Sequence, residues 1–169
     1  YTTGDPLKEA FIPLGYDEPR NLREILAQHP KGREYGWILE KEPRYPLLKD
    51  AKGSILSLPP IINSNDLGKV TEQTTNVLVE VTGTKLDAVE KVLNIVVATL
   101  YDRNAKVYSV TIDYPWRINN ETTKVTPNMQ PEIMILDPHE VNKVLGLSLK
   151  PQQLIALIKQ RRMDVKLFK

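Results

Sequence analysis

Residues 76–100 read NVLVEVTGTKLDAVEKVLNIVVATL, and this stretch decides the fold that the sequence predicts. Its first seven residues alternate with the period of a half-buried strand. One face of that strand would carry Val77, Val79 and Val81. Glu80 and Thr82 would then point together to the other face, which makes them a candidate polar pair.

The rest of the stretch predicts the longest helix of the chain. Gly83 and Thr84 supply a turn and a cap before it. Apolar residues then recur at helical spacing, at Leu86, Val89, Leu93, Val96 and Leu100. We expect this stripe to be core and the helix to cover a sheet, to which a second alternating segment, residues 106–114, adds a strand. A mixed sheet of β-branched strands with one long covering helix predicts the α+β class.

The first half of the chain predicts an arm, a helix and further strands. Residues 1–19 are interrupted by Gly and Pro, which is typical of an extended arm. A short helix is predicted from Pro19, and residues 29–32 end it. Strands are predicted at residues 35–39 and in a hairpin whose turn, residues 50–53, joins 47–48 to 54–58.

The polar residues 117–128, centred on Asn119 and Asn120, are the predicted linker, because they offer no apolar periodicity with which to join a core. The sequence therefore predicts one domain at residues 1–116 and a second at 129–169. In the second, Asp137 caps a helix with Pro138 at its first position and Gly146 at its end. The other elements predicted there are a strand at 132–136, a helix at 151–161 and a strand at 164–168. This succession resembles a winged helix.

Composition limits the classes of function. The chain has 169 residues, 41% of them hydrophobic, which is enough for one core or two small ones. Its 23 basic and 21 acidic residues nearly cancel, so composition alone does not indicate nucleic-acid binding. The absence of cysteine excludes a disulfide framework, a thiolate metal site and a cysteine nucleophile. The missing cysteines fit an intracellular protein. No apolar run approaches the roughly 20 residues of a membrane span. The chain begins at Tyr1 and not at Met, so we expect a segment before it.

Two motifs carry a resemblance to a known family. They are SLPPIINS at residues 57–64 and EVTGT at residues 80–84. Further matching stretches are KGREYG at 31–36, YPLL at 45–48 and VNKVLG at 141–146. In these motifs and their spacing, nearly the whole chain resembles the β subunit of archaeal and eukaryotic-type phenylalanyl-tRNA synthetases. The resemblance implies a piece of a longer subunit, without the first part of the editing domain and without the catalytic-like domain that follows.

The resemblance also implies a function and a site. It implies part of an aminoacyl-tRNA synthetase, a ligase, whose editing domain hydrolyses tyrosine mischarged onto tRNA(Phe). It maps the editing pocket onto Leu48, Ser57, Glu80 and Thr82. Leu48 and Glu80 would bind the substrate, as the ring wall and as the acceptor of the phenolic proton. Ser57 and Thr82 would be catalytic, by orienting the ester or the attacking water.

The same resemblance sets expectations for cofactors, partners and location. No cofactor or metal is expected in this chain, because the family's magnesium ligands lie past Lys169. ATP and Mg²⁺ would serve aminoacylation in the parent enzyme. The expected partners are tRNA(Phe) and the α subunit, with no membrane, and the expected location is the cytoplasm.

Each site residue also has a plainer interpretation. Glu80 and Thr82 can be a solvated strand face, Ser57 a turn-capping hydroxyl and Leu48 core. The alternative function is a noncatalytic structural and tRNA-docking module of the same synthetase with editing lost. A third is a stand-alone protein similar to the editing domain.

Other polar residues are expected to have no role in the chemistry. His29, expected to face solvent at a helix end, and His139, in a first helical turn, stand in no triad arrangement. The tail is basic and is expected to be a solvated face rather than a nucleic-acid contact; its residues are Lys150, Lys159, Arg161, Arg162, Lys166 and Lys169.

Overall fold

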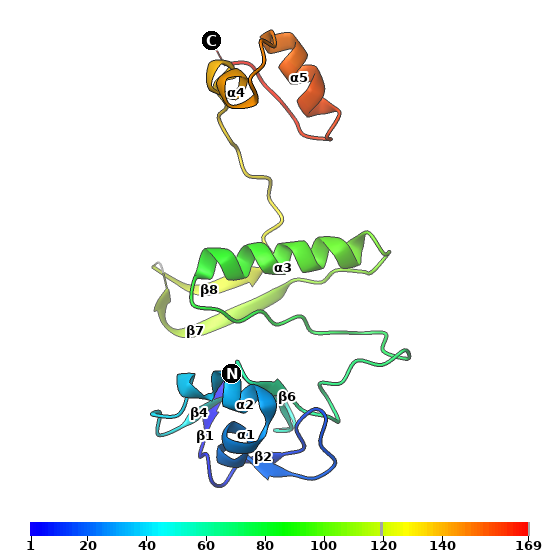
Figure 1. The fold of residues 1–169 in the computed structure, drawn as a ribbon. Helices are drawn as coiled ribbons and strands as arrows, with labels where there is room; N and C mark the ends of the chain where they lie inside the picture. Colours follow the sequence, from blue (N-terminus) through cyan, green and yellow to red (C-terminus); the bar gives the residue numbers. More distant parts are fainter. Residues whose placement is uncertain (119, 169) are drawn as a thin grey trace. The chain divides into compact units, whose positions relative to one another are not determined.

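The structure, a computed structural model, describes residues 1–118 and 120–168 and confirms the α+β class. It forms two compact units, Tyr1–Asn128 and Met129–Lys169. The helices are α1 (Leu22–Gln28), α2 (Pro30–Tyr35), the 3-10 helix η1 (Gly36–Ile38), α3 (Leu86–Tyr101), α4 (Pro138–Leu145) and α5 (Pro151–Lys159) (Figure 1). The strands are β1 (Thr2–Gly4), β2 (Ala10–Phe11), β3 (Arg20–Asn21), β4 (Tyr45–Lys49), β5 (Ile55–Leu58), β6 (Ile62–Asn63), β7 (Val110–Ile118) and β8 (Glu121–Thr126). They are arranged in three antiparallel sheets, of order β1-β4-β5-β6, β2-β3 and β7-β8.

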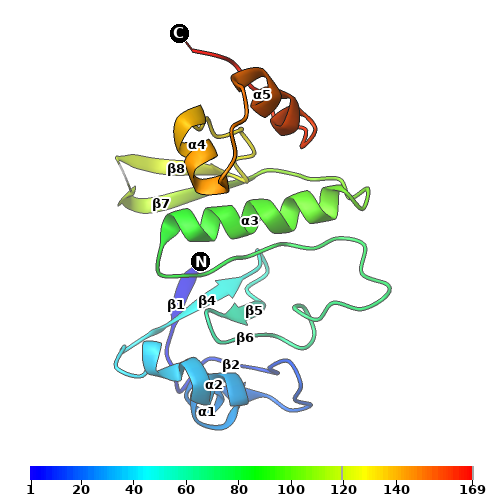
Figure 2. The ribbon, with the colours of Figure 1, turned by 45° about the horizontal axis from the view of Figure 1, so that its top comes forward.

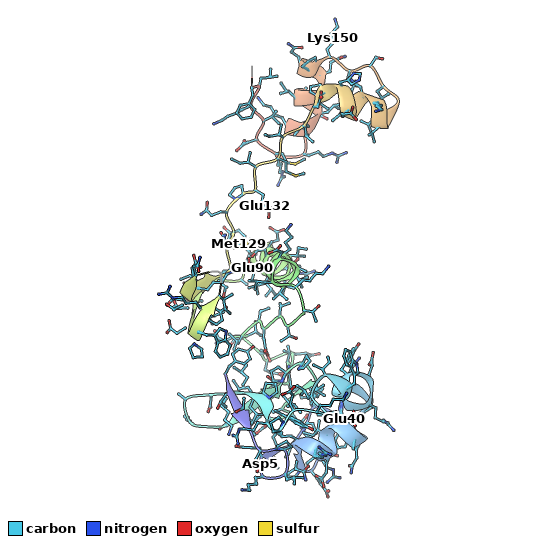
Figure 3. All side chains as sticks on the ribbon, turned by 90° about the vertical axis from the view of Figure 1, so that its left-hand side faces the viewer. Asp5, Glu40, Glu90, Met129, Glu132 and Lys150 are labelled. Atoms are coloured by element: carbon cyan, nitrogen blue, oxygen red, sulfur yellow. The ribbon has the colours of Figure 1, made fainter. Side chains whose placement is uncertain are left out.

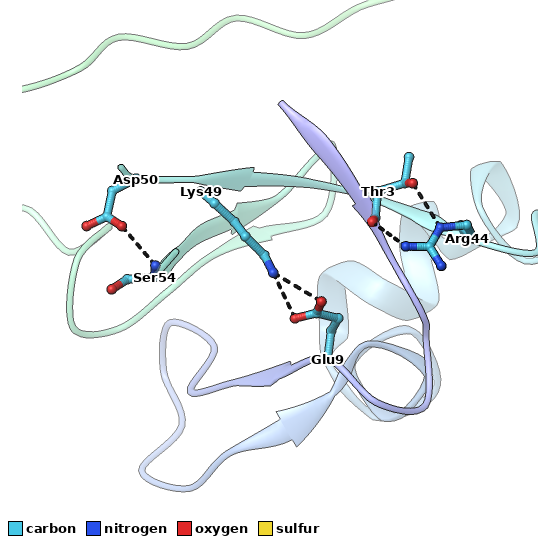
Figure 4. Close-up of polar contacts among 6 residues, drawn as sticks. All are labelled: Thr3, Glu9, Arg44, Lys49, Asp50 and Ser54. Carbon is cyan, nitrogen blue, oxygen red and sulfur yellow. Dashed lines mark hydrogen bonds and ion pairs between the residues drawn. The ribbon is translucent and has the colours of Figure 1, made fainter. Parts of the chain in front are cut away.

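The four-stranded sheet is built around the predicted β4–β5 hairpin. Its turn closes because the Asp50 carboxylate accepts the backbone N–H groups of Lys52 and Ser54, and Gly53 takes a φ of +86°. The predicted arm contributes β1, which pairs along β4. Arg44 fixes this edge strand by donating to the backbone carbonyl and the hydroxyl of Thr3 (Figure 4). The N-terminal segment is therefore part of the sheet and not a free arm.

The prediction for residues 29–39 was wrong in two ways. His29 does end α1, but it also caps α2, because its Nδ1 accepts the backbone N–H of Lys31. Pro30 at the first helical position then starts a helix, since proline there loses no hydrogen bond. The expected strand at 35–39 is instead the end of α2 followed by η1.

The main core lies in the first third of the chain, where α1 packs against the four-stranded sheet. Its members with no exposed surface are Leu22, Tyr45, Leu47 and Leu58. Phe11, Ile25, Leu39 and Ile61 complete the buried cluster. An ion pair between Lys49 and Glu9, with Nζ 3.0 Å from Oε2, ties β4 to the loop before β2 at the edge of this core (Figure 4).

The predicted long helix is confirmed as α3, and it lies along the β7–β8 hairpin (Figure 2). Lys124 of β8 pairs with Glu90 of α3, and the Asn94 amide donates to the Asn128 carbonyl at 2.6 Å. The expectation that the Leu86-to-Leu100 stripe is core was wrong in part. Val97 is the buried residue of this helix, whereas Leu86 and Val96 are exposed. A two-stranded hairpin is too narrow to cover a 16-residue helix with apolar residues on more than one side.

Two strand predictions and the linker also needed correction. Residues 76–82 have the strand period but pair with no strand in the described part of the chain. The strand expected at 106–114 begins later, at Val110, and runs to Ile118. Residues 121–126, inside the expected linker 117–128, form β8, whose register pairs Val110 with Thr126. Because residues 121–126 are rich in threonine, they carry no apolar alternation, and the sequence pattern did not predict β8. Asn119 lies outside the described residues.

The second unit confirms its predicted helices but not a winged helix. Asp137 accepts the backbone N–H of His139 at the start of α4, and Gly146 ends it with a φ of +65°. Residues 132–136 (Figure 3 labels Glu132) and residues 164–168 form no strand. Both strand predictions were therefore wrong, and Lys169 is outside the described residues. None of the helices described in either unit is long and apolar enough to cross a membrane.

Candidate functional site

The four-stranded sheet places a row of side chains across three strands. Ser57 of β5 pairs with Leu48 of β4 on one side and with Asn63 of β6 on the other. Residues directly opposite one another in neighbouring strands point to the same face. Leu48 is half-buried, Ser57 is buried with 4% of its surface exposed, and Asn63 is exposed. The central residue of the row, Ser57, is therefore the most buried of the three.

Glu80 reaches this row although its own segment joins no sheet. The Ser57 hydroxyl donates to Oε2 of Glu80 at 3.4 Å. The Tyr1 hydroxyl donates to the other carboxylate oxygen, Oε1. These contacts join residues 23 and 79 positions apart in the chain. Glu80 is thus brought to Ser57 by the path of the loop and not by a strand ladder.

A cleft of about 370 Å³ opens beside these groups. It is lined by Leu14, Lys31, Tyr35, residues 57–63, Glu80 and Thr82. Most of the wall is apolar, with a few polar groups, and the volume is at the small end of ordinary ligand pockets. Of the predicted site residues, Ser57, Glu80 and Thr82 meet here. Leu48 lies beside Ser57 in the sheet but does not line the cleft.

The side chains of α2 form a charged edge of the cleft. Lys31 donates to Glu34 with Nζ 2.9 Å from Oε2, and its ammonium lies 5.2 Å from the centre of the Tyr35 ring. Hydrogen bonds from Tyr35 and Lys31 lower the pKa of Glu34, and the bond to Glu34 raises the pKa of Lys31. Lys31 is therefore a permanent cation at this edge.

Partial desolvation of the hydroxyl is the largest cause that raises the pKa of Tyr1, although the residue as a whole is 72% exposed, and the hydrogen bond to Glu80 raises the pKa further. Tyr1 is therefore a neutral phenol, and a donor, at neutral pH. The hydrogen bond from Tyr1 therefore places a phenol on the carboxylate of Glu80, which the sequence analysis proposed as a site residue.

The two histidines are structural or remote. His29 is buried and not solvent-facing as expected: Nδ1 accepts from Lys31, so Nε2 carries the proton and donates to the Leu14 carbonyl at 3.3 Å. His139 is exposed in α4 of the second unit. Within residues 1–118 and 120–168, no three His, Cys, Asp or Glu side chains gather as a metal site requires.

Sequence reasoning missed four groups at this site, namely Tyr1, Lys31, Tyr35 and Asn63. Lys31, Tyr35 and Asn63 stand inside the motifs KGREYG and SLPPIINS, so the motifs pointed at them without assigning a role. Tyr1 has no such signal, since only the pairing of β1 with β4 brings it near Glu80.

Comparison with known proteins gives one consistent result. No protein-family profile matches the chain. The phenylalanine–tRNA ligase β subunits of Thermococcus kodakarensis and Thermococcus gammatolerans are 41% and 42% identical to it over 159 residues. Each alignment covers 94% of this chain. The β subunit of Methanococcus vannielii is 40% identical over 164 residues. The chain spans about a quarter of these relatives, 27% of the length of each.

A solved structure supports the same relationship. The crystal structure of an N-terminal fragment of the phenylalanyl-tRNA synthetase β subunit from Pyrococcus horikoshii superposes with a TM-score of 0.79 at 34% identity. The match covers 95% of this chain and 45% of that one. Sequence and fold therefore agree over almost every residue, and the chain belongs to the phenylalanyl-tRNA synthetase β-subunit family.

Proposed function

We propose that this chain carries the editing site of a phenylalanine–tRNA ligase and hydrolyses tyrosine that has been mischarged onto tRNA(Phe). The observation that carries the proposal is the carboxylate of Glu80 on the wall of a mostly apolar cleft, with a hydroxyl donor on each of its oxygens. Such an acceptor favours a ligand that combines an aromatic ring with a hydroxyl.

A synthetase for phenylalanine needs such a second site. A hydrophobic pocket cannot strongly reject an analogue that merely adds a hydroxyl, and the discrimination is only ~10²-fold. A site that requires the hydroxyl discriminates far better, because phenylalanine would leave its polar wall unpaired. Glu80 supplies that wall in this cleft.

The remaining roles follow from position. An aminoacyl ester is already activated, so an oriented water is sufficient for hydrolysis and no nucleophilic side chain is required. Thr82, exposed at the cleft, is assigned to orienting the ester or the water. Ser57 shares that task and also holds the Glu80 carboxylate. Leu48, one strand behind Ser57, supports the wall against which the ring packs.

The parent enzyme would supply the rest of the reaction. We propose that the longer β subunit acts with an α subunit, which carries out aminoacylation with ATP and Mg²⁺. The RNA partner is tRNA(Phe), presented through its mischarged 3′ end, and the location is the cytoplasm. None of this chain's residues is assigned to the metal or to ATP.

The test is the release of tyrosine from tyrosyl-tRNA(Phe) by the complete enzyme, with phenylalanyl-tRNA(Phe) as the control substrate. Ser57→Ala is expected to lower the rate constant for the tyrosyl substrate about tenfold, because a hydrogen bond to a charged group is lost. Ser54→Ala, an exposed serine of the same hairpin, is the matched control and should change nothing. If the wild type released no tyrosine, the noncatalytic structural and tRNA-docking function would replace this one.

A further inference from the structure

Both oxygens of the Glu80 carboxylate already hold a hydroxyl. Ser57, which lines the cleft, donates to Oε2, and Tyr1, which lies outside the lining, donates to Oε1. The two donors differ in burial: Ser57 is 4% exposed, whereas Tyr1 is 72% exposed. Ser57 is a fixed partner of the sheet, and Tyr1 is a partner whose side chain can swing away into water.

Tyr1 also presents the same chemical group that the proposed substrate would present. Both are neutral phenols, and a phenol on a carboxylate makes a short, charge-assisted bond. The raised pKa of Tyr1 keeps its proton in place at neutral pH. One phenol can therefore replace the other on Oε1 without changing the charge of the site.

The backbone next to Tyr1 is held by the sheet, whereas its side chain is held through its bond to Glu80. Thr2, the next residue, pairs with Leu47 of β4, and Arg44 holds Thr3 in the same strand. The paired strand thus places the Tyr1 phenol beside Glu80. Its release requires a side-chain rotation and leaves the β1–β4 ladder intact.

We propose that Tyr1 is an internal competitor for Glu80, whose phenol occupies the place of the substrate's phenol and must leave before a tyrosyl ester can bind. This inference rests on the proposed editing function. In the wild type, the ester binds more weakly because it must first displace Tyr1 from Glu80. The hydrolytic step itself is unaltered. Tyr1 therefore acts by occupying Glu80, and it takes no part in the hydrolytic step.

Tyr1→Phe in the complete enzyme tests the inference, because it removes only the competing hydroxyl. The probe is a non-hydrolysable analogue of tyrosyl-adenosine in which an amide replaces the ester. Its dissociation constant, measured by calorimetry, is expected to fall about tenfold, since no bond to the carboxylate must be broken first. The KM for tyrosyl-tRNA(Phe) should fall with it while kcat stays unchanged. Tyr108→Phe, which alters a tyrosine that is 76% exposed, is the control and should leave both constants as they are.

The outcomes of this experiment distinguish a failure of the Tyr1 inference from a failure of the proposed editing function. An unchanged dissociation constant for Tyr1→Phe would show that the phenol does not compete, and a raised one would show that Tyr1 helps to hold Glu80 in place; either overturns the inference. Failure of the wild type to release tyrosine, with the analogue still bound more tightly by Tyr1→Phe, would overturn the editing function alone. Tighter binding together with unchanged kcat supports both.

Discussion

Glu80→Ala is expected to lower kcat/KM for tyrosine release from tyrosyl-tRNA(Phe) about a hundredfold, because the acceptor of the substrate's phenolic proton is lost. Release from phenylalanyl-tRNA(Phe) should not fall, since that substrate has no hydroxyl to offer. The measurement is single-turnover deacylation by the complete enzyme with each substrate.

Two further variants make this result specific. Glu80→Gln keeps the size of the side chain and a hydrogen-bond acceptor but removes the charge, so its effect should be smaller than that of Glu80→Ala. Glu72→Ala removes an exposed carboxylate from the loop that leads to Glu80 and should have no effect. Equal tyrosine release by the wild type and Glu80→Ala would remove Glu80 from the recognition of the hydroxyl.

Gly32→Ala is expected to destabilise the first unit by about 3 kcal/mol, a large cost for one methyl group. A Cβ at Gly32 would lie 2.1 Å from the Ile25 carbonyl oxygen and 2.7 Å from the Leu26 Cα. These are backbone atoms of α1, so they cannot move aside as a side chain can. The change should separate α1 from α2 and displace Lys31 and Tyr35 from the cleft.

Gly36→Ala is the matched control, because a Cβ there would meet the flexible Leu26 side chain, with Cγ at 3.1 Å. Urea denaturation of the two variants and the wild type measures the difference. Equal midpoints for Gly32→Ala and Gly36→Ala would contradict the close packing of α1 on α2.

The elements that the sequence predicted correctly are those with local start and stop signals. The α4 helix has its cap at Asp137 and its left-handed end at Gly146. The β4–β5 hairpin has its turn in Asp50 and Gly53. In each case the residues that decide the structure are within a few positions of one another, so a single sequence contains the information.

The wrong predictions arose where a sequence pattern needed a pairing partner far away in the chain, or where it was compatible with two structures. Pro30 was interpreted as the end of a helix, whereas with His29 as its cap it begins another. The strand period at residues 76–82 lacks a partner strand, and alternation alone cannot supply one. The same limit applies to the site. Family resemblance proposed Glu80 and Ser57 as site residues, but the Tyr1 contact depends on strand pairing and was not predictable.

The most direct test of the central claim, that Glu80 recognises a tyrosyl hydroxyl, is a crystal structure of the complete enzyme with the amide analogue of tyrosyl-adenosine. We expect the ligand's phenolic oxygen within hydrogen-bond distance of the Glu80 carboxylate, its ring against the apolar wall, and the Tyr1 side chain displaced. A ligand bound elsewhere, or bound with its phenol directed away from Glu80 while Tyr1 keeps its bond, would contradict the claim.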